Sequence, residues 1–204
     1  MDLTSYDNGH SGKGLLFVIS SVSGGGKTTV IGELLKSLGD LRLSVSHTTR
    51  RPRAGEKNGQ DYNFTSVENF KERIKGGQFL EWAEVYGHYY GTSKGTVDAI
   101  IREGCDVLLD IDVQGAMQVK NSVSGAILIF ILPPGEKEHE RRLKDRGTES
   151  DLDINIRLEA ARQELAFVKE YHYCVLNDDV EDAVNAVRSI IRAERCRVRS
   201  TGQA

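Results

Sequence analysis

The chain has 204 residues, with 27 Lys and Arg against 30 Asp and Glu, and therefore a net charge of −3. This length suits one domain that buries a stable core without a disulfide or a structural metal. The near-neutral charge argues against a protein that coats nucleic acid, and we expect no nucleic-acid partner. Three cysteines, at positions 105, 174 and 196, lack the spacing of a disulfide framework or a zinc site. This favours a reduced, cytoplasmic protein.

The first 14 residues are polar and rich in glycine, without the basic start and apolar centre of a signal peptide, and they predict a flexible leader. No apolar run approaches the roughly 20 residues that cross a bilayer, so we expect no membrane association. Residues 15–204 show no repeat and no Pro/Ser-rich linker, which predicts a single domain. The sequence leaves the choice between a monomer and a homo-oligomer open.

The predicted elements alternate along the chain. Short β-rich apolar runs predict buried strands at residues 15–19, 106–111, 126–132 and 173–176. Apolar residues at helical spacing predict helices at 28–38, 96–102, 136–146, 153–169 and 180–195. Such alternation predicts an α/β fold with a parallel sheet covered by helices on both faces. Between about 43 and 91, short alternating stretches broken by glycines predict a small mixed insertion with antiparallel strands.

A glycine-rich loop follows the first predicted strand. Residues 21–28 read SVSGGGKT, close to the phosphate-loop template G-x-x-x-x-G-K-[ST]. Glycines let successive backbone N–H groups surround an anion, Lys27 can reach the outer phosphates, and the Thr28 hydroxyl can ligate Mg²⁺. Ser21 replaces the first glycine, and its Cβ limits the backbone angles available there. The alternative is a flexible glycine turn between strand and helix, but a chance match to the template with the correct flanking elements is rare, so we expect a nucleotide site.

Two acidic residues lie near the end of the strand predicted at 106–111. Asp110 has the position at which phosphate-loop enzymes hold Mg²⁺ opposite the loop, through bound water. Asp112 lies two residues further on and is expected to share its face of the strand. An acid at a strand end is common by itself, and the loop is what favours a metal or substrate role.

A basic cluster lies in the predicted insertion. Arg50, Arg51 and Arg53 surround Pro52, and residues 40–60 carry a net charge of +3 in an otherwise acidic chain. Forked guanidinium groups match a phosphate dianion, although solvated surface arginines remain the plainer interpretation of the cluster alone.

At this cluster the sequence resembles the guanylate kinase family, and the similarity runs from about residue 15 to 187. It rests on SVSHTTRRPRAGE at 44–56, NGQDYNF at 58–64, FLEWAEVYGHYYGT at 79–92, LLDIDVQGA at 108–116, and RGTES and NIRL within 146–158. The resemblance implies a phosphate-loop NTPase-type core at 15–42, 93–135 and 165–204. It also implies a GMP-binding insertion at 43–92 and a helical lid at 136–164. The implied reaction is Mg²⁺-dependent phosphate transfer from ATP to GMP, in purine metabolism and GMP recycling.

The resemblance also implies roles for single residues. Catalytic roles fall on Lys27, Arg53, Arg146 and Arg157. ATP contacts fall on Ser23, Gly24, Gly25, Gly26, Lys27, Thr28, Thr29, Arg142, Asn177 and Asp178, and Mg²⁺ contacts on Thr28 and Asp110. GMP phosphate contacts fall on Arg50, Arg53, Tyr62 and Tyr90, base contacts on Ser46, Glu81 and Thr92, and a further contact with that nucleotide on Asp112.

Some of these residues have plainer interpretations. Glu81 accepts the two adjacent N–H donors of guanine, which adenine lacks, but without the resemblance it would be a polar residue of an edge strand. Asn177 and Asp178 would otherwise form the turn and cap before the last helix. Arg142 and Arg146 share a helix face, with Glu138 one turn earlier as a possible partner of Arg142.

Two other functions remain open on the sequence. One is a kinase on the same frame for a sugar phosphate or a pyrimidine monophosphate, which the set of Ser46, Glu81 and Thr92 disfavours. The other is a catalytically silent interaction module resembling guanylate kinase. Such modules typically lose the phosphate loop and the lid arginines, whereas Lys27 and Arg157 are present.

Overall fold

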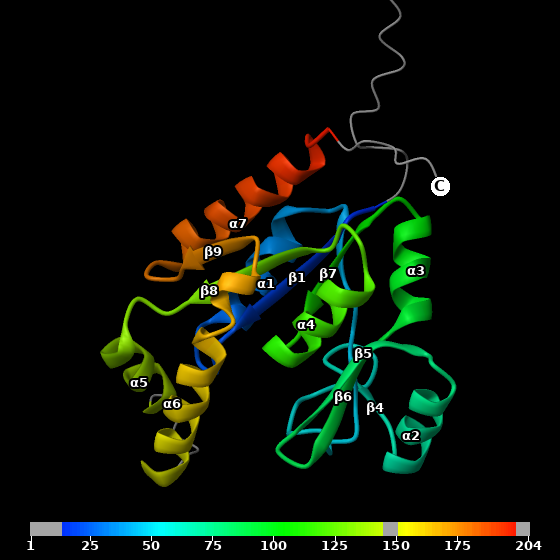
Figure 1. Ribbon diagram of the computed structural model, residues 1–204, viewed down its shortest axis with the longest axis horizontal. Helices are drawn as coiled ribbons and strands as arrows, with labels where there is room; N and C mark the ends of the chain where they lie inside the picture. The colour runs from blue at the N-terminus through cyan, green and yellow to red at the C-terminus, as the bar shows by residue number, and fades with distance from the viewer. Residues whose placement is uncertain (1–13, 145–150, 199–204) are drawn as a thin grey trace, which may run out of the picture.

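The computed structural model describes residues 14–144 and 151–198, and of residues 151–155 the backbone alone. Its larger sheet has five strands in the order β2-β7-β1-β8-β9, and every neighbouring pair is parallel (Figure 1). The strands are β1 (Leu16–Ser21), β2 (Leu41–Leu43), β7 (Asp106–Asp110), β8 (Ile127–Leu132) and β9 (Tyr173–Leu176). Their carboxyl ends meet at one edge of the sheet, where ligands bind in open α/β folds.

Helices cover both faces of this sheet because its strands are apolar on both sides. Phe17 and Ile19 of β1 pack in one cluster with α1 (Lys27–Ser37) and α7 (Val180–Arg195). Leu16 and Val18 point to the opposite face and pack with α3 (Lys94–Arg102) and α4 (Val113–Ser122). Successive side chains of a strand alternate between the two faces, so all six residues of β1 are buried.

A second, four-stranded sheet has the order β4-β3-β6-β5. Its strands are β3 (His47–Thr48), β4 (Asn63–Phe64), β5 (Phe79–Val85) and β6 (His88–Ser93), and the helix α2 (Val67–Lys75) connects β4 to β5. The pairs β3–β6 and β5–β6 are antiparallel and confirm the expected mixed insertion, while β3 and β4 pair in parallel. Phe70 of α2 stacks on Phe79 with ring centroids 4.4 Å apart, which fixes the helix against the sheet.

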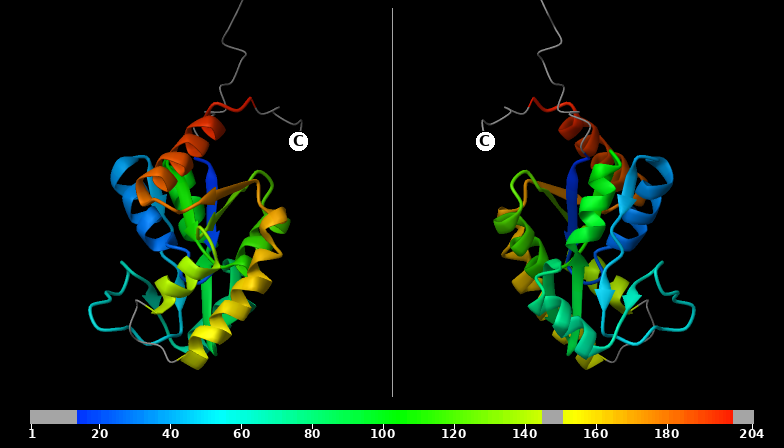
Figure 2. Two further views of the ribbon diagram at one scale, coloured as in Figure 1. Left: turned by 90° about the vertical axis from the view of Figure 1, so that its left-hand side faces the viewer. Right: turned by 90° about the vertical axis from the view of Figure 1, so that its right-hand side faces the viewer.

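Two further helices, α5 (Glu136–Lys144) and α6 (Asp151–Leu165), follow β8, and a 3₁₀ turn (Val168–Glu170) leads from them to β9. In Figure 1 they lie to the left of the small sheet, and both views of Figure 2 show α6 and the small sheet at the same end of the larger sheet. Ala161 of α6 packs with Val22, Val113 and Phe130, beside the end of β1. This contact brings α6 to the edge of the sheet where β1 and β7 end.

The structure confirms the four predicted strands and the helix at 180–195, and it shifts the helices predicted at 28–38, 96–102 and 153–169 at their ends. The helix predicted at 136–146 begins at Glu136 as expected, and its predicted end lies outside the described residues. Two elements of the larger fold, β2 and α4, were not predicted. Asp112 does not share a strand face with Asp110, because β7 ends at Asp110 and Asp112 caps α4 through a hydrogen bond from the Gly115 N–H (2.9 Å). The predicted leader lies almost wholly outside the described residues. Within residues 14–144 and 151–198, no helix is both long enough and apolar enough to span a bilayer.

Candidate active site

The loop between β1 and α1 has the geometry of an anion cradle. Gly24 and Gly26 both have φ of 86°, a left-handed conformation that glycine adopts without steric cost. Gly26 is also the N-cap of α1 and offers no side chain to the first N–H groups of the helix. Those groups are therefore left for an external acceptor, and the helix dipole favours a negative charge there.

Ser21, which replaces the first template glycine, causes no strain. It is the last residue of β1, and Tyr86 is the only non-glycine residue in the described chain with a positive φ. The side chain does face a narrow space, because a Cβ on Gly25 would lie 3.1 Å from the Ser21 Cβ. A small residue therefore fits this position, and the backbone does not require glycine.

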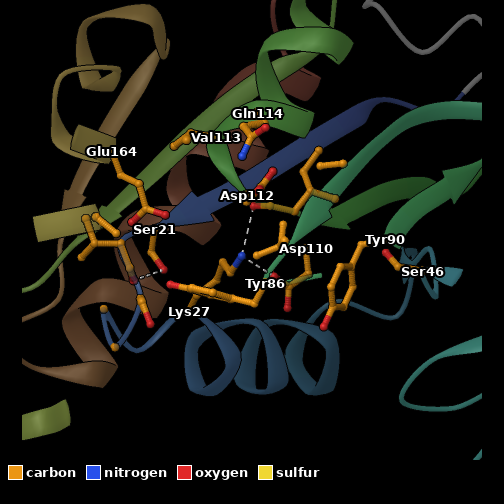
Figure 3. Close-up of a pocket in the computed structure, with 18 of the residues that line it drawn as sticks. Ser21, Lys27, Ser46, Tyr86, Tyr90, Asp110, Asp112, Val113, Gln114 and Glu164 are labelled. Atoms are coloured by element: carbon orange, nitrogen blue, oxygen red, sulfur yellow. Dashed lines mark hydrogen bonds and ion pairs between the residues drawn. The ribbon is translucent and has the colours of Figure 1, made fainter. Parts of the chain in front are cut away.

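Lys27 lies at the centre of the site (Figure 3). Its Nζ forms an ion pair with Asp110 Oδ1 at 2.6 Å and donates a hydrogen bond to the Ile111 carbonyl at 3.1 Å. The lysine is thus held between the phosphate loop and the end of β7. The predicted opposition of Asp110 and the loop is present, and the charges of Lys27 and Asp110 neutralise each other.

A cavity of about 650 Å³ extends from the loop to the small sheet and to α6. Most of the predicted site residues line it: Ser23, Gly24, Gly25, Gly26, Lys27, Thr28, Ser46, Arg53, Tyr62, Glu81, Tyr90, Asp110, Asp112 and Arg157. Six others do not line it: Thr29, Arg50, Thr92, Arg142, Asn177 and Asp178. Arg146 lies outside the described residues. Figure 3 shows Ser46 and Tyr90 on one side of Lys27 and Glu164 on the other.

Glu81 is the most unusual polar group of the cavity. Its side chain stands on β5 opposite Thr92 of β6 and is only 4% exposed. Within the described part of the chain, its Oε1 has no hydrogen-bond partner. Burial raises the pKa of Glu81 to about 7, and the negative charge of Asp112 adds to the shift. A buried carboxylate oxygen without a partner is costly, so Oε1 points to a ligand that donates a hydrogen bond.

The raised pKa of Glu81 predicts how stability varies with pH in the ligand-free protein. The folded state binds a proton that the unfolded chain releases near pH 4.5, so this contribution to stability is lost as pH rises through about 7. Between pH 5 and 8, the wild type should lose roughly 2 kcal/mol of unfolding free energy relative to Glu81→Gln. Urea unfolding of both proteins at the two pH values measures this difference, and parallel pH profiles would contradict it.

The arginine-rich loop before β4 is organised by Glu56, which the sequence analysis did not single out. Its carboxylate accepts two hydrogen bonds from Arg50, at 3.0 and 2.8 Å, and one from the Arg53 N–H at 2.7 Å. The Arg50 guanidinium also lies 5.3 Å from the ring centroid of Tyr62. Arg50 is therefore held beside the cavity, while Arg53 lines it.

On the opposite side, Ser23 of the loop contacts both helices that follow β8. Its Oγ accepts a hydrogen bond from Arg157 Nη1 at 2.9 Å, and its carbonyl contacts the ring of the buried His139 on α5. Glu164 of α6 lines the same side, and burial raises the pKa of its carboxyl. Sequence reasoning missed His139 and Glu164, because each is one polar residue among many on a charged helix.

Asn177 stabilises the phosphate loop through a hydrogen bond to its backbone. Its Nδ2 donates to the Gly25 carbonyl at 2.8 Å, and a Cβ on Gly26 would lie 2.2 Å from the same nitrogen. The alternative interpretation of Asn177 or Asp178 as the cap of the last helix is wrong, because Asp179 caps α7 by accepting hydrogen bonds from the N–H groups of Glu181 and Asp182. Arg142 pairs with Glu138 at 2.9 Å, as predicted, and its Nη1 lies 3.6 Å from the Cβ position of Gly26.

The parallel sheet, its phosphate loop and the shared cavity define a nucleotide-binding protein of the phosphate-loop NTPase fold. The family model described as guanylate kinase matches residues 13–194, and the chain belongs to the guanylate kinase family. A guanylate kinase from Caldanaerobacter subterraneus subsp. tengcongensis is 52% identical over 91% of this chain and 90% of its own length. One from Thermotoga maritima is 49% identical over the same shares. The crystal structure of guanylate kinase from Anaplasma phagocytophilum has a TM-score of 0.75 at 32% identity, covering 92% of this chain and 90% of that one.

Proposed function

We propose that this protein transfers the γ-phosphate of ATP to GMP, giving ADP and GDP, in a reaction that requires Mg²⁺. The observation that carries the proposal is Glu81, a buried acid whose Oε1 has no hydrogen-bond partner in the described chain, in one cavity with the phosphate loop. Guanine offers two adjacent N–H donors to such a group, whereas adenine offers no such pair. A site that leaves a buried acid unpaired with the wrong base reaches high selectivity.

On the donor side, the amides of Gly24, Gly25 and Gly26 and the Lys27 ammonium bind the ATP phosphates. Asn177 and Asp178 lie on the adenine side of ATP in this proposal, and Arg142 contacts ATP from the lid. Thr29, in the first turn of α1, also contacts ATP. The contact between Asn177 and the Gly25 carbonyl supports a further role for this side chain, which is to hold the loop in its cradle shape.

The donors near the loop fit Mg²⁺. Thr28 lies in the first turn of α1 beside the loop, and Asp110 ends β7 opposite it. Hydroxyl, carboxylate and water oxygens are the ligands that this ion takes. When bound, the ion neutralises charge on the phosphate oxygens. Among the described residues, no group of three His, Cys, Asp or Glu side chains forms a metal site of its own. The proposed site therefore depends on ATP for further oxygen ligands.

On the acceptor side, the insertion at 43–92 binds GMP. Arg50, Arg53, Tyr62 and Tyr90 hold its phosphate, and Ser46, Glu81 and Thr92 hold its base, with Asp112 beside them. The pairing of Arg50 with Glu56 supports this assignment, because it fixes the guanidinium before the substrate arrives.

The helices at 136–164 act as the lid. Phosphoryl transfer needs mainly positioning and neutralisation of charge on the transferring group, and Arg53, Arg146 and Arg157 supply positive charge there. The contact of Arg157 with Ser23 supports its place beside the phosphate loop. A closed lid also keeps water from accepting the phosphate in place of GMP. The three cysteines are free, which supports a reducing, cytoplasmic setting.

The test is the release of ADP with MgATP and one of four acceptor conditions: GMP, AMP, dTMP or no acceptor. We expect turnover with GMP and only background rates with the others. Turnover with dTMP in place of GMP would indicate a pyrimidine monophosphate kinase, and turnover with AMP would contradict the role of Glu81 in selecting guanine. No turnover in folded protein that still binds GMP would indicate the silent interaction module.

A further inference from the structure

Helix α4 approaches the Glu81 carboxylate more closely than a side chain would allow. A Cβ on Gly115 would lie 2.5 Å from Glu81 Oε2 and 3.1 Å from its Cδ, well inside normal contact. Gly115 is buried in the first turn of α4, although glycine has a lower helix propensity than alanine. The missing side chain therefore leaves the space that the carboxylate fills.

One turn further along α4, Gln118 holds the residue next to Glu81. Its Nε2 donates to the Trp82 carbonyl at 2.7 Å, and its Oε1 accepts from the Trp82 N–H at 3.2 Å. The side-chain amide thus pairs with β5 much as a neighbouring strand would. Residues three apart lie on the same face of a helix, so Gly115 and Gln118 present one surface to β5.

We propose that Gly115 and Gln118 are positioning residues for base selection. Gln118 fixes the backbone of β5 against α4, and Gly115 sets how far the Glu81 carboxylate can lie toward the helix. Two parallel hydrogen bonds to guanine need a carboxylate held in one position and orientation, because bidentate pairing is geometrically strict. This inference rests on the proposed function, since it assigns to α4 the control of the group that selects guanine.

The first experiment is Gly115→Ala, with kinetics in GMP and in ATP. The added methyl group displaces the carboxylate, so the KM for GMP should rise about tenfold, while the KM for ATP and the kcat at saturating GMP change less than about twofold. Gly32→Ala is the matched control, because Gly32 lies within α1 and nothing stands within 4 Å of its Cβ position. The control should keep both KM values.

The second experiment repeats Gly115→Ala in a Glu81→Ala background and measures kcat/KM for GMP from the linear range of the rate. With no carboxylate to displace, Gly115→Ala should have less than about a twofold effect there. An equal loss in both backgrounds would mean that the methyl group damages α4 in general, and it would overturn the proposal.

Gln118→Met keeps the length of the side chain and removes both hydrogen bonds. It should raise the KM for GMP several-fold without changing the KM for ATP, and it provides a test even if Gly115→Ala does not fold. Wild-type KM values for GMP in both folded variants would overturn the inference while leaving the proposed function intact. Absence of GMP phosphorylation by the wild type would overturn both.

Discussion

Replacing Glu81 with glutamine should lower kcat/KM for GMP about 100-fold, because hydrogen bonds to a charged group contribute roughly 1.5–3 kcal/mol each. The amide has one acceptor oxygen where the carboxylate has two, and its NH₂ group faces the donors of guanine. The KM for ATP should stay unchanged, since Glu81 lies on the small sheet and not in the phosphate loop. Initial rates with each substrate varied in turn measure both constants.

The same variant should also discriminate less between GMP and AMP, because a glutamine amide can accept from the adenine amine and donate to the adjacent ring nitrogen. Glu72→Gln is the matched control, with the same change at an exposed position of α2. Equal affinity for GMP in wild type and Glu81→Gln would refute the role of Glu81 in base selection.

Replacing Lys27 with methionine should reduce kcat on the order of 1000-fold, the cost of removing a preorganised charge from the site of phosphoryl transfer. The methionine keeps the length of the side chain and loses the ammonium that pairs with Asp110. Stability should change little, because the Asp110 side chain is 34% exposed and water can solvate it when the lysine is absent. Single-turnover kinetics with MgATP and GMP separate this loss from product release.

A surface lysine of the same helix provides the control. Lys36 pairs with Glu33 far along α1 and is well exposed, so Lys36→Met should keep the wild-type rate. If Lys27→Met also kept most of its turnover, the charge at the loop would have no catalytic part, and the assignment of the donor site would be wrong.

The larger sheet could be predicted because its strands are buried on both faces and appear as continuous apolar runs. β2 was missed because it has only three residues, of which Arg42 is exposed. α4 was missed because Gly115 lowers its helix propensity, and because it begins three residues after β7 ends. Gly115, which lowers the helix propensity of α4, also leaves room for the Glu81 carboxylate.

The sequence predicted those residues of the candidate site that lie within recognisable motifs. The loop, Asp110 and Glu81 lie in recognisable segments, and the structure places all of them around one cavity. The pairing of Arg50 with Glu56 and the contacts of Ser23 with α5 and α6 depend on how loops and helices fold back on one another. No local pattern of residue types contains that information.

The position of Ser21 has a consequence for recognising such loops in other chains. The residue ends a strand with an ordinary backbone, and the left-handed turns fall on Gly24 and Gly26 instead. A search pattern that insists on glycine at the first position would therefore reject loops whose shape is intact. A pattern that allows any small residue there, and requires glycine only where φ is positive, would retain them.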